Sequence, residues 1–239
     1  MIESQWLSAN TRPLTMLAHI DRTAGTRKKL LIAVAGLRLV EELLPVEIRT
    51  AIDDIERSDE SDDPPGVLYK SLVQVRNYRR AHLVRGETWE TWQTAAQYAL
   101  IAALDPTVQP GNRRCFEWVI MARTHEAARG AKQTILGEIR SQLCNLIREI
   151  VGNPFQPWQV VPDFLGGGRV QPDGRTIQLS DSARSLAEQI HIDQAYDRLP
   201  ILADALEESS VTDAAMLAHC RSDAHHLRGC WALEVVCGR

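Results

Sequence analysis

The sequence predicts an all-α protein of about ten helices, with one short β-hairpin near residues 168–179. Apolar residues recur at three- and four-residue spacing along most of the chain, which is the period of an amphipathic helix. Clusters of glycine, proline, asparagine and aspartate interrupt this pattern and mark the turns. The chain has 239 residues, of which 44% are hydrophobic and 24% charged, so it has ordinary globular composition and can bury a sizeable core.

The N-terminal region, residues 1–152, is expected to hold the longer helices. Pro13 and Pro45 stand where two helices begin, and Thr26 is expected to cap another. The strongest amphipathic pattern extends from Ile135 to Ile150. The expected helical segments are residues 13–20, 26–40, 45–56, 67–84, 88–104 and 113–151, the last broken near Gly130.

The C-terminal region, residues 153–239, is expected to hold the hairpin and several short helices, and to pack with the N-terminal region as one unit. Pro172-Asp173-Gly174 is turn chemistry between Val170 and Ile177-Gln178-Leu179. The short helices are expected at residues 183–190 (capped by Ser180 or Asp181), 194–198 (capped by Asp193), 201–207 (opened by Pro200), 214–221 (capped by Thr212) and 226–236 (ended by Gly238).

The net charge, the apolar stretches and the cysteine content limit the classes of protein to which this chain can belong. A net charge of −4 gives no general attraction to nucleic acid or to anionic lipid. The longest apolar stretch, residues 30–37, is too short to span a bilayer, and the N-terminus lacks the features of a signal peptide. Five cysteines without a framework-like spacing indicate reduced thiols, so we expect a cytoplasmic protein away from membranes.

Five short motifs stand out near the two ends of the chain. They are Trp6-Leu7 with Pro13 and Met16-Leu17; Arg27-Lys28; Asn153-Pro154-Phe155-x-Pro157; the run from Tyr196-Asp197-Arg198-Leu199-Pro200 to Glu207; and His219-Cys220-Arg221-x4-His226-x-Arg228-Gly229-Cys230-Trp231. Together they resemble an uncharacterised, paralogue-rich family of bacterial proteins. Its members often carry Cys-Cys-Arg-Arg where this chain has Ala35-Gly36-Leu37-Arg38, which argues against a site that needs those cysteines. The resemblance implies no known activity.

The last twenty-one residues concentrate cysteine and histidine, and Cys220-x4-His225-x4-Cys230 has the spacing of the last three ligands of a zinc knuckle. The first ligand is missing, because Leu217 stands at its position. His219 is a poor replacement, since it lies about 100° around a helix from its neighbour Cys220. We therefore expect the cysteines to pack as small apolar residues on inward helix faces. The candidate metal ligands, for zinc, are Cys220, His225, His226 and Cys230. A cysteine nucleophile activated by a histidine is a further hypothesis, but no third residue that would orient the histidine can be identified from the spacing.

Arg76 and His82 fit the loose Arg-polar-x4-His pattern of helical HEPN ribonucleases, and Arg221-x4-His226 fits it more loosely still. The same basic segment, residues 76–85, is expected to pair with the acidic segment, residues 53–63, or with a partner. Nucleic acid is a less favoured partner, because few aromatic side chains are near. Asp204, Glu207 and Glu208 are interpreted as a solvated helix face.

The sequence contains no complete motif for nucleotide binding, metal binding or covalent catalysis. It favours a non-catalytic adaptor or scaffold that binds another protein, in a multi-gene or defence-type system, with Trp6 and Trp158 as exposed contact residues. No cofactor is predicted. The alternatives are a metal-independent HEPN-like ribonuclease that uses Arg76 and His82, and a small zinc-supported module around Cys220, His226 and Cys230.

Overall fold

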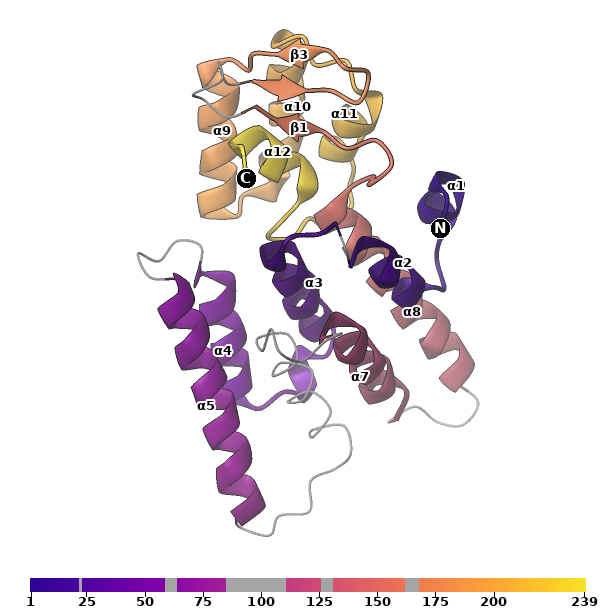
Figure 1. Cartoon of the computed structure of the whole chain (residues 1–239), viewed down its shortest axis with the longest axis vertical. Coiled ribbons are helices and arrows are strands. Elements are labelled where there is room, and N and C mark those ends of the chain that lie inside the picture. Colours follow the sequence, from indigo (N-terminus) through magenta and orange to yellow (C-terminus); the bar gives the residue numbers. More distant parts are fainter. Residues whose placement is uncertain (22, 59–63, 85–110, 126–130, 162–167) are drawn as a thin grey trace. The chain divides into compact units, whose positions relative to one another are not determined.

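The computed structural model describes residues 1–21, 23–58, 64–84, 111–125, 131–161 and 168–239 (Figure 1). They form two compact units, Met1–Ile147 and Arg148–Arg239. Helices dominate both, and the only strands among the described residues form one small sheet, so the predicted fold class is confirmed. The region boundary predicted at residue 152 falls inside the second unit, because that unit includes the last turn of a helix.

The elements in the described part of the first unit are all helical. They are α1 (Glu3–Ser8), α2 (Pro13–Ile20), α3 (Thr26–Arg38), the 3₁₀ turn η1 (Glu41–Leu43), α4 (Val46–Glu56), α5 (Pro64–Val84), α7 (Gly111–His125) and most of α8 (Lys132–Val151). Pro13 and Pro45 stand at the helix starts where they were expected. The residue at the N-cap of α3 is Gly25, so Thr26 is the first helical residue and not the cap. The helix expected at residues 88–104 lies outside the described residues.

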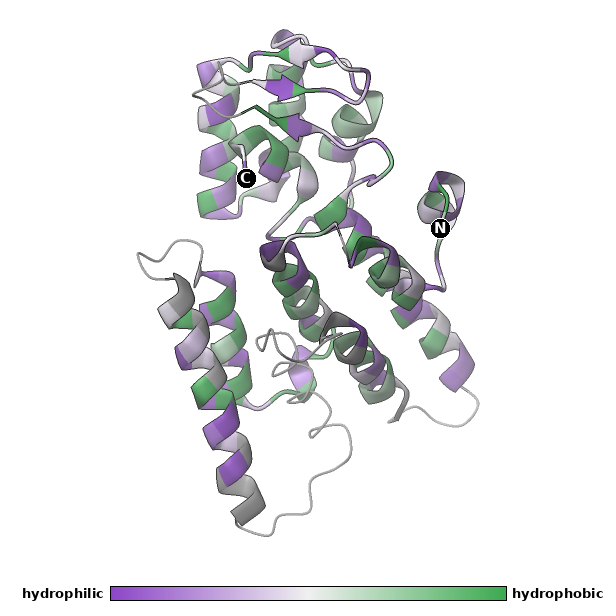
Figure 2. Cartoon of the chain, viewed as in Figure 1, coloured by the Kyte–Doolittle hydropathy of each residue, from purple (hydrophilic) through white to green (hydrophobic). Residues whose placement is uncertain are grey.

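Apolar faces hold this unit together. Helix α4 packs on α5, and α7 packs on both α2 and α3. Gly36 lets α3 approach α7 closely, because a Cβ there would lie 2.8 Å from the Phe116 ring. Trp6 is fully buried, so the expectation that it is an exposed contact residue is wrong. In Figure 2 the helices carry hydrophobic and hydrophilic segments along the same ribbon, as amphipathic helices do.

The second unit combines a three-stranded antiparallel sheet with short helices. The strands β1 (Gln159–Val160), β2 (Arg169–Val170) and β3 (Thr176–Ile177) lie in the order β1-β2-β3, and β2 and β3 form the predicted hairpin. Strand β1 was not expected. The helices are α9 (Asp181–Asp193), η4 (Tyr196–Arg198), α10 (Leu199–Glu208), α11 (Ala214–Cys220) and α12 (Trp231–Cys237).

The caps and first residues of the helices in this unit agree only partly with the prediction. Ser180 caps α9 as expected, through a hydrogen bond from the Ala183 amide to its hydroxyl. Asp213, not Thr212, caps α11, because its carboxylate accepts from two amides of the first turn. The last helix begins at Trp231 and not at His226. Trp158 is partly buried and donates to Asp213, so it is not a free contact residue.

None of the described helices combines the length and the hydropathy needed to cross a bilayer.

Candidate functional site

Four side chains of ligand-forming types meet in the second unit: Glu149, His219, His226 and Cys230, here called the terminal cluster. One nitrogen, oxygen or sulfur atom from each lies within 4.8 Å of those from the other three. Glu149 comes from the last turn of α8, His219 from α11, His226 from the connection between α11 and α12, and Cys230 from the N-cap position of α12. Three segments that are separate in the chain therefore supply one cluster.

Gly152 helps to bring these segments together. Its φ of +74° ends α8 just after Glu149, and a Cβ there would lie 2.9 Å from the Trp231 ring. A side chain at this position would therefore strain the backbone and displace Trp231. The Trp231 ring in turn lies 5.2 Å from the His219 ring, centre to centre. Glycine thus lets the chain turn and lets Trp231 pack beside the cluster.

The polar contacts within the cluster are short. Glu149 Oε1 lies 3.1 Å from His226 Nδ1, and Glu149 Oε2 lies 3.5 Å from His219 Nε2. Cys230 Sγ lies 3.2 Å from the same His219 nitrogen. The two imidazole rings meet edge to face, with centres 4.9 Å apart. Glu149, His226 and Cys230 are buried, and His219 is mostly buried.

Burial and the Glu149 carboxylate set the protonation of the cluster. Burial raises the pKa of the Cys230 thiol well above its ordinary value, and the Glu149 charge raises it further. Burial lowers the pKa of His219, against the opposing effect of Glu149. Burial also acts to lower the pKa of His226, but its hydrogen bond to Glu149 and the charge of that carboxylate raise the net value. The cluster therefore favours a neutral Cys230 thiol, and Glu149 favours the protonated form of His226.

These atoms do not form a catalytic triad. In a nucleophile-histidine-acid triad, the nucleophile and the acid contact opposite nitrogens of the imidazole. Here the Cys230 sulfur and the Glu149 carboxylate both lie beside Nε2 of His219. A reactive cysteine also has a lowered pKa, whereas that of Cys230 is raised. The donor atoms converge on one point, which is how ligands surround a metal ion.

Only part of this cluster was predicted. His226 and Cys230 belong to it, but Cys220 does not: it is fully buried in the apolar core of the second unit, and its pKa is raised to about 12, mainly by burial. His225 is exposed and is not in the cluster either. The sequence reading discounted His219 and did not consider Glu149, which lies 77 residues from His226. Glu149 interrupts the apolar pattern of α8 between two buried isoleucines, Ile147 and Ile150, and this is the one signal that could have drawn attention to it.

Two of the three other carboxylates that were considered, Asp204 and Glu207, pair with an arginine. The Arg221 guanidinium, which is exposed, donates to both of them on α10. Arg221 is therefore already engaged by carboxylates, and the looser ribonuclease pattern that includes it stays a prediction. Asp204 and Glu207 lie on an exposed face, as the sequence indicated.

The stronger ribonuclease pattern is only partly described. Arg76 is an exposed residue of α5, and His82 lies on the same helix, but the His82 side chain is outside the described residues. The convergence of Arg76 and His82 on one cleft therefore stays a prediction.

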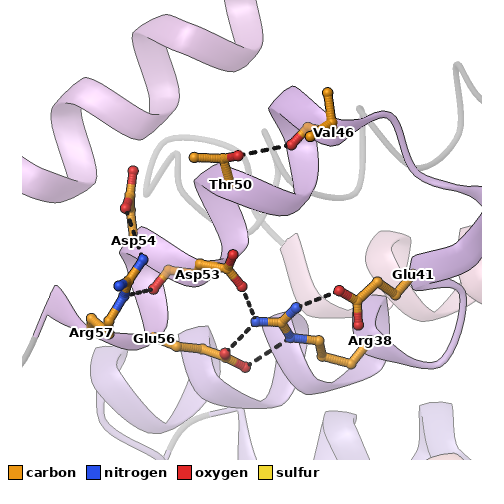
Figure 3. A network of polar contacts seen from close by, with 8 residues as sticks. All are labelled: Arg38, Glu41, Val46, Thr50, Asp53, Asp54, Glu56 and Arg57. Carbon is orange, nitrogen blue, oxygen red and sulfur yellow. Dashed lines mark hydrogen bonds and ion pairs between the residues drawn. The ribbon is translucent and has the colours of Figure 1, made fainter.

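A second polar network lies in the first unit (Figure 3). Arg38, in the last turn of α3, donates to Glu41 and to both Asp53 and Glu56 on α4. Part of the acidic segment therefore pairs with Arg38, a cation outside the basic segment at residues 76–85. Arg38 belongs to the four residues that replace Cys-Cys-Arg-Arg in the resemblance described above, and here it joins two helices.

No family model, no curated protein and no solved structure matches this chain. The resemblance to an uncharacterised bacterial family stays a prediction.

Proposed function

We propose that this chain is a non-catalytic interaction module, an adaptor or scaffold for another protein. The observation that supports this most directly is the shared nitrogen in the terminal cluster. A thiol and a carboxylate on the same imidazole nitrogen cannot act as nucleophile and orienting acid, and burial of the thiol keeps it protonated. The cluster therefore serves to join structural segments.

Two exposed apolar side chains on the same unit support the proposal of a partner surface. Ile192 at the end of α9 and Ile201 at the start of α10 are 63% and 57% exposed. The two helices pack against each other and are joined by a short connection, so both isoleucines lie near the end of the pair where that connection runs. We call Ile192 and Ile201 the apolar pair. Large apolar side chains exposed together cost free energy in water, and they gain it when a partner covers them.

The proposal is tested by capture of partners from the organism that encodes the chain. We expect the unaltered chain to retain a specific partner, and Ile192→Asp or Ile201→Asp to lose it, because each places a charge where an apolar contact is needed. Ser185→Asp is the matched control, since it adds the same charge at an exposed position nearer the start of α9. Retention of the partner by both isoleucine variants would show that the apolar pair is not the contact surface.

A second measurement tests the non-catalytic part of the proposal. Purified chain incubated with single-stranded RNA is expected to leave it intact. Cleavage that Arg76→Ala and His82→Ala both abolish would replace the adaptor proposal by the ribonuclease alternative.

A further inference from the structure

The terminal cluster has the composition of a structural metal centre, which goes beyond an interaction role. It offers two imidazole nitrogens, one carboxylate oxygen and one sulfur. Histidine, cysteine and carboxylate ligands in a set of four are typical of zinc, whereas calcium and magnesium prefer oxygen ligands alone. Glu149 and a Cys230 thiolate would together carry two negative charges, which balance one divalent cation bound by two neutral imidazoles.

The spacing of the donor atoms fits a tetrahedral ion. Zinc–ligand bonds of about 2.0 to 2.3 Å at tetrahedral angles place neighbouring donors about 3.3 to 3.6 Å apart. The Cys230 sulfur lies 3.2 Å from His219 Nε2, and the two oxygens of Glu149 lie 3.1 Å from His226 Nδ1 and 3.5 Å from His219 Nε2. One donor atom from each of the four residues lies within 4.8 Å of the other three. The donors are therefore close to the required arrangement, and only the wider pairs must draw together around an ion.

The surroundings of His226 add a second observation. Its Nε2 is buried and makes no hydrogen bond of normal geometry, while its Nδ1 lies 3.1 Å from Glu149 Oε1. A zinc ion on Nδ1 would leave the Nε2 nitrogen with the proton. A metal-bound histidine usually gives this second N–H to a carboxylate, a backbone carbonyl or a water molecule.

We propose that Glu149, His219, His226 and Cys230 bind one zinc ion as a closed structural site. As the ion binds, a bond forms between zinc and the Cys230 sulfur, and the thiol proton leaves to solvent. All four positions around the ion are filled by protein atoms, and the ligands are largely buried, so no coordination position is left for a substrate. The ion ties the last turn of α8 to α11 and to the start of α12.

The experiment uses the full chain, purified without a polyhistidine tag and without chelator. Metal analysis is expected to find about one zinc per chain. Replacement of zinc by Co²⁺ is expected to give the visible bands of a tetrahedral ion and a thiolate-to-cobalt charge-transfer band. Absence of both stoichiometric zinc and this charge-transfer band would overturn the proposal.

Variants assign the ligands. Cys230→Ser is expected to remove the charge-transfer band, and Glu149→Gln to weaken zinc binding by more than about 100-fold, since loss of a ligand exceeds the 10- to 100-fold cost of losing a ligand's supporting partner. Cys220→Ser and His225→Asn are the matched controls, because they change neighbouring residues of the same types outside the cluster. An unchanged band in Cys230→Ser, or its loss in His225→Asn, would show that the ligand set is wrong.

A variant that is expected to strengthen the charge-transfer band distinguishes loss of a ligand from failure to fold. His219→Cys keeps four ligands and adds a second thiolate, so the charge-transfer band of the cobalt form is expected to grow about twofold. A folded His219→Cys chain with an unchanged band would exclude His219 as a ligand. These results are independent of partner capture, so the zinc site and the adaptor role succeed or fail separately.

Discussion

The two units bury different kinds of side chain. Among the described residues, the buried polar side chains of the first unit are two serines, Ser58 and Ser71. The second unit, although it is the smaller, buries the polar and charged side chains Glu149, Arg169, Gln171, His191, His226, Arg228 and Glu234.

This difference has consequences for stability. Apolar packing is not directional and tolerates substitutions that conserve volume. A buried polar group instead requires particular partners, and removal of one partner leaves the other unsatisfied. The second unit should therefore lose more free energy of unfolding than the first when one polar side chain is removed. Three pairs of variants and one single variant, from the largest expected effect to the smallest, test this contrast.

Substitution of Arg169 is expected to lower the free energy of unfolding the most. Its guanidinium is buried and donates to the backbone carbonyls of Gly168, Val235 and Val236, which joins β2 to the end of α12. Arg169→Met leaves these buried carbonyls without a charged donor, so we expect the free energy of unfolding to fall by about 3 kcal/mol. Denaturant unfolding followed by circular dichroism measures it. Arg184→Met, at an exposed position of α9, should cost only about 0.5 kcal/mol. Equal losses would show that burial of the guanidinium does not decide the size of the loss.

Substitution of Gly137 inside α8 and of Gly152 directly after it should change stability in opposite directions. Gly152→Ala must hold a positive φ and push against Trp231, which should cost about 2 kcal/mol. Gly137→Ala lies inside the helix with no atom within 4 Å of the new Cβ, so it should stabilise by about 0.5 to 1 kcal/mol. Melting temperatures of the two variants decide the question, and a shift in the same direction for both would refute this account of Gly152.

The structure and the sequence assign different N-cap residues to α11. Asp213 accepts from the Ala215 and Met216 amides and from the Trp158 indole, so Asp213→Ala should cost about 1 to 2 kcal/mol. Thr212→Ala, at the position that the sequence favoured, should cost less than about 0.5 kcal/mol. Chemical denaturation compares the two, and a larger loss for Thr212→Ala would restore the original assignment.

The smallest effect is expected in the first unit. Arg38→Ala breaks the contacts to Glu41, Asp53 and Glu56, but these groups are partly exposed and screened by solvent. We expect a loss of about 0.5 to 1 kcal/mol that shrinks as salt is added. Unfolding in low and high salt provides the measurement. A salt-independent loss as large as that of Arg169→Met would show that the two units do not differ in this way.

Local patterns in the sequence predicted much of the fold. The apolar period placed most helices of the described residues, Ser180 was identified as a cap, and Pro172-Asp173-Gly174 marked the hairpin turn. The prediction that Cys220 lies on an inward helix face is also confirmed, because it is a fully buried residue of α11. Cys230 is fully buried too, but it stands at the N-cap of α12 and not on a helix face. These features depend on neighbours within a few residues, and such neighbours are visible in a sequence.

The sequence predicted only two of the four residues of the terminal cluster, and the reason is physical. Cys230 and His226 share a short connection, so spacing alone brings them near each other. Glu149 joins them because α8 ends at Gly152 and the chain returns after the sheet and three helices. His219 was discounted because spacing on a single helix turns it away from Cys220, yet its partner is Cys230 on another segment.

The sequence by itself determined the helical class, the hairpin and the inward position of Cys220 on α11, because backbone geometry and apolar period act locally. Only the tertiary structure decided that a carboxylate of α8, two imidazoles and a thiol meet around one point. Contacts between distant segments depend on how helices pack and on where glycine lets the chain turn. The sequence spacing of the residues that meet predicts neither.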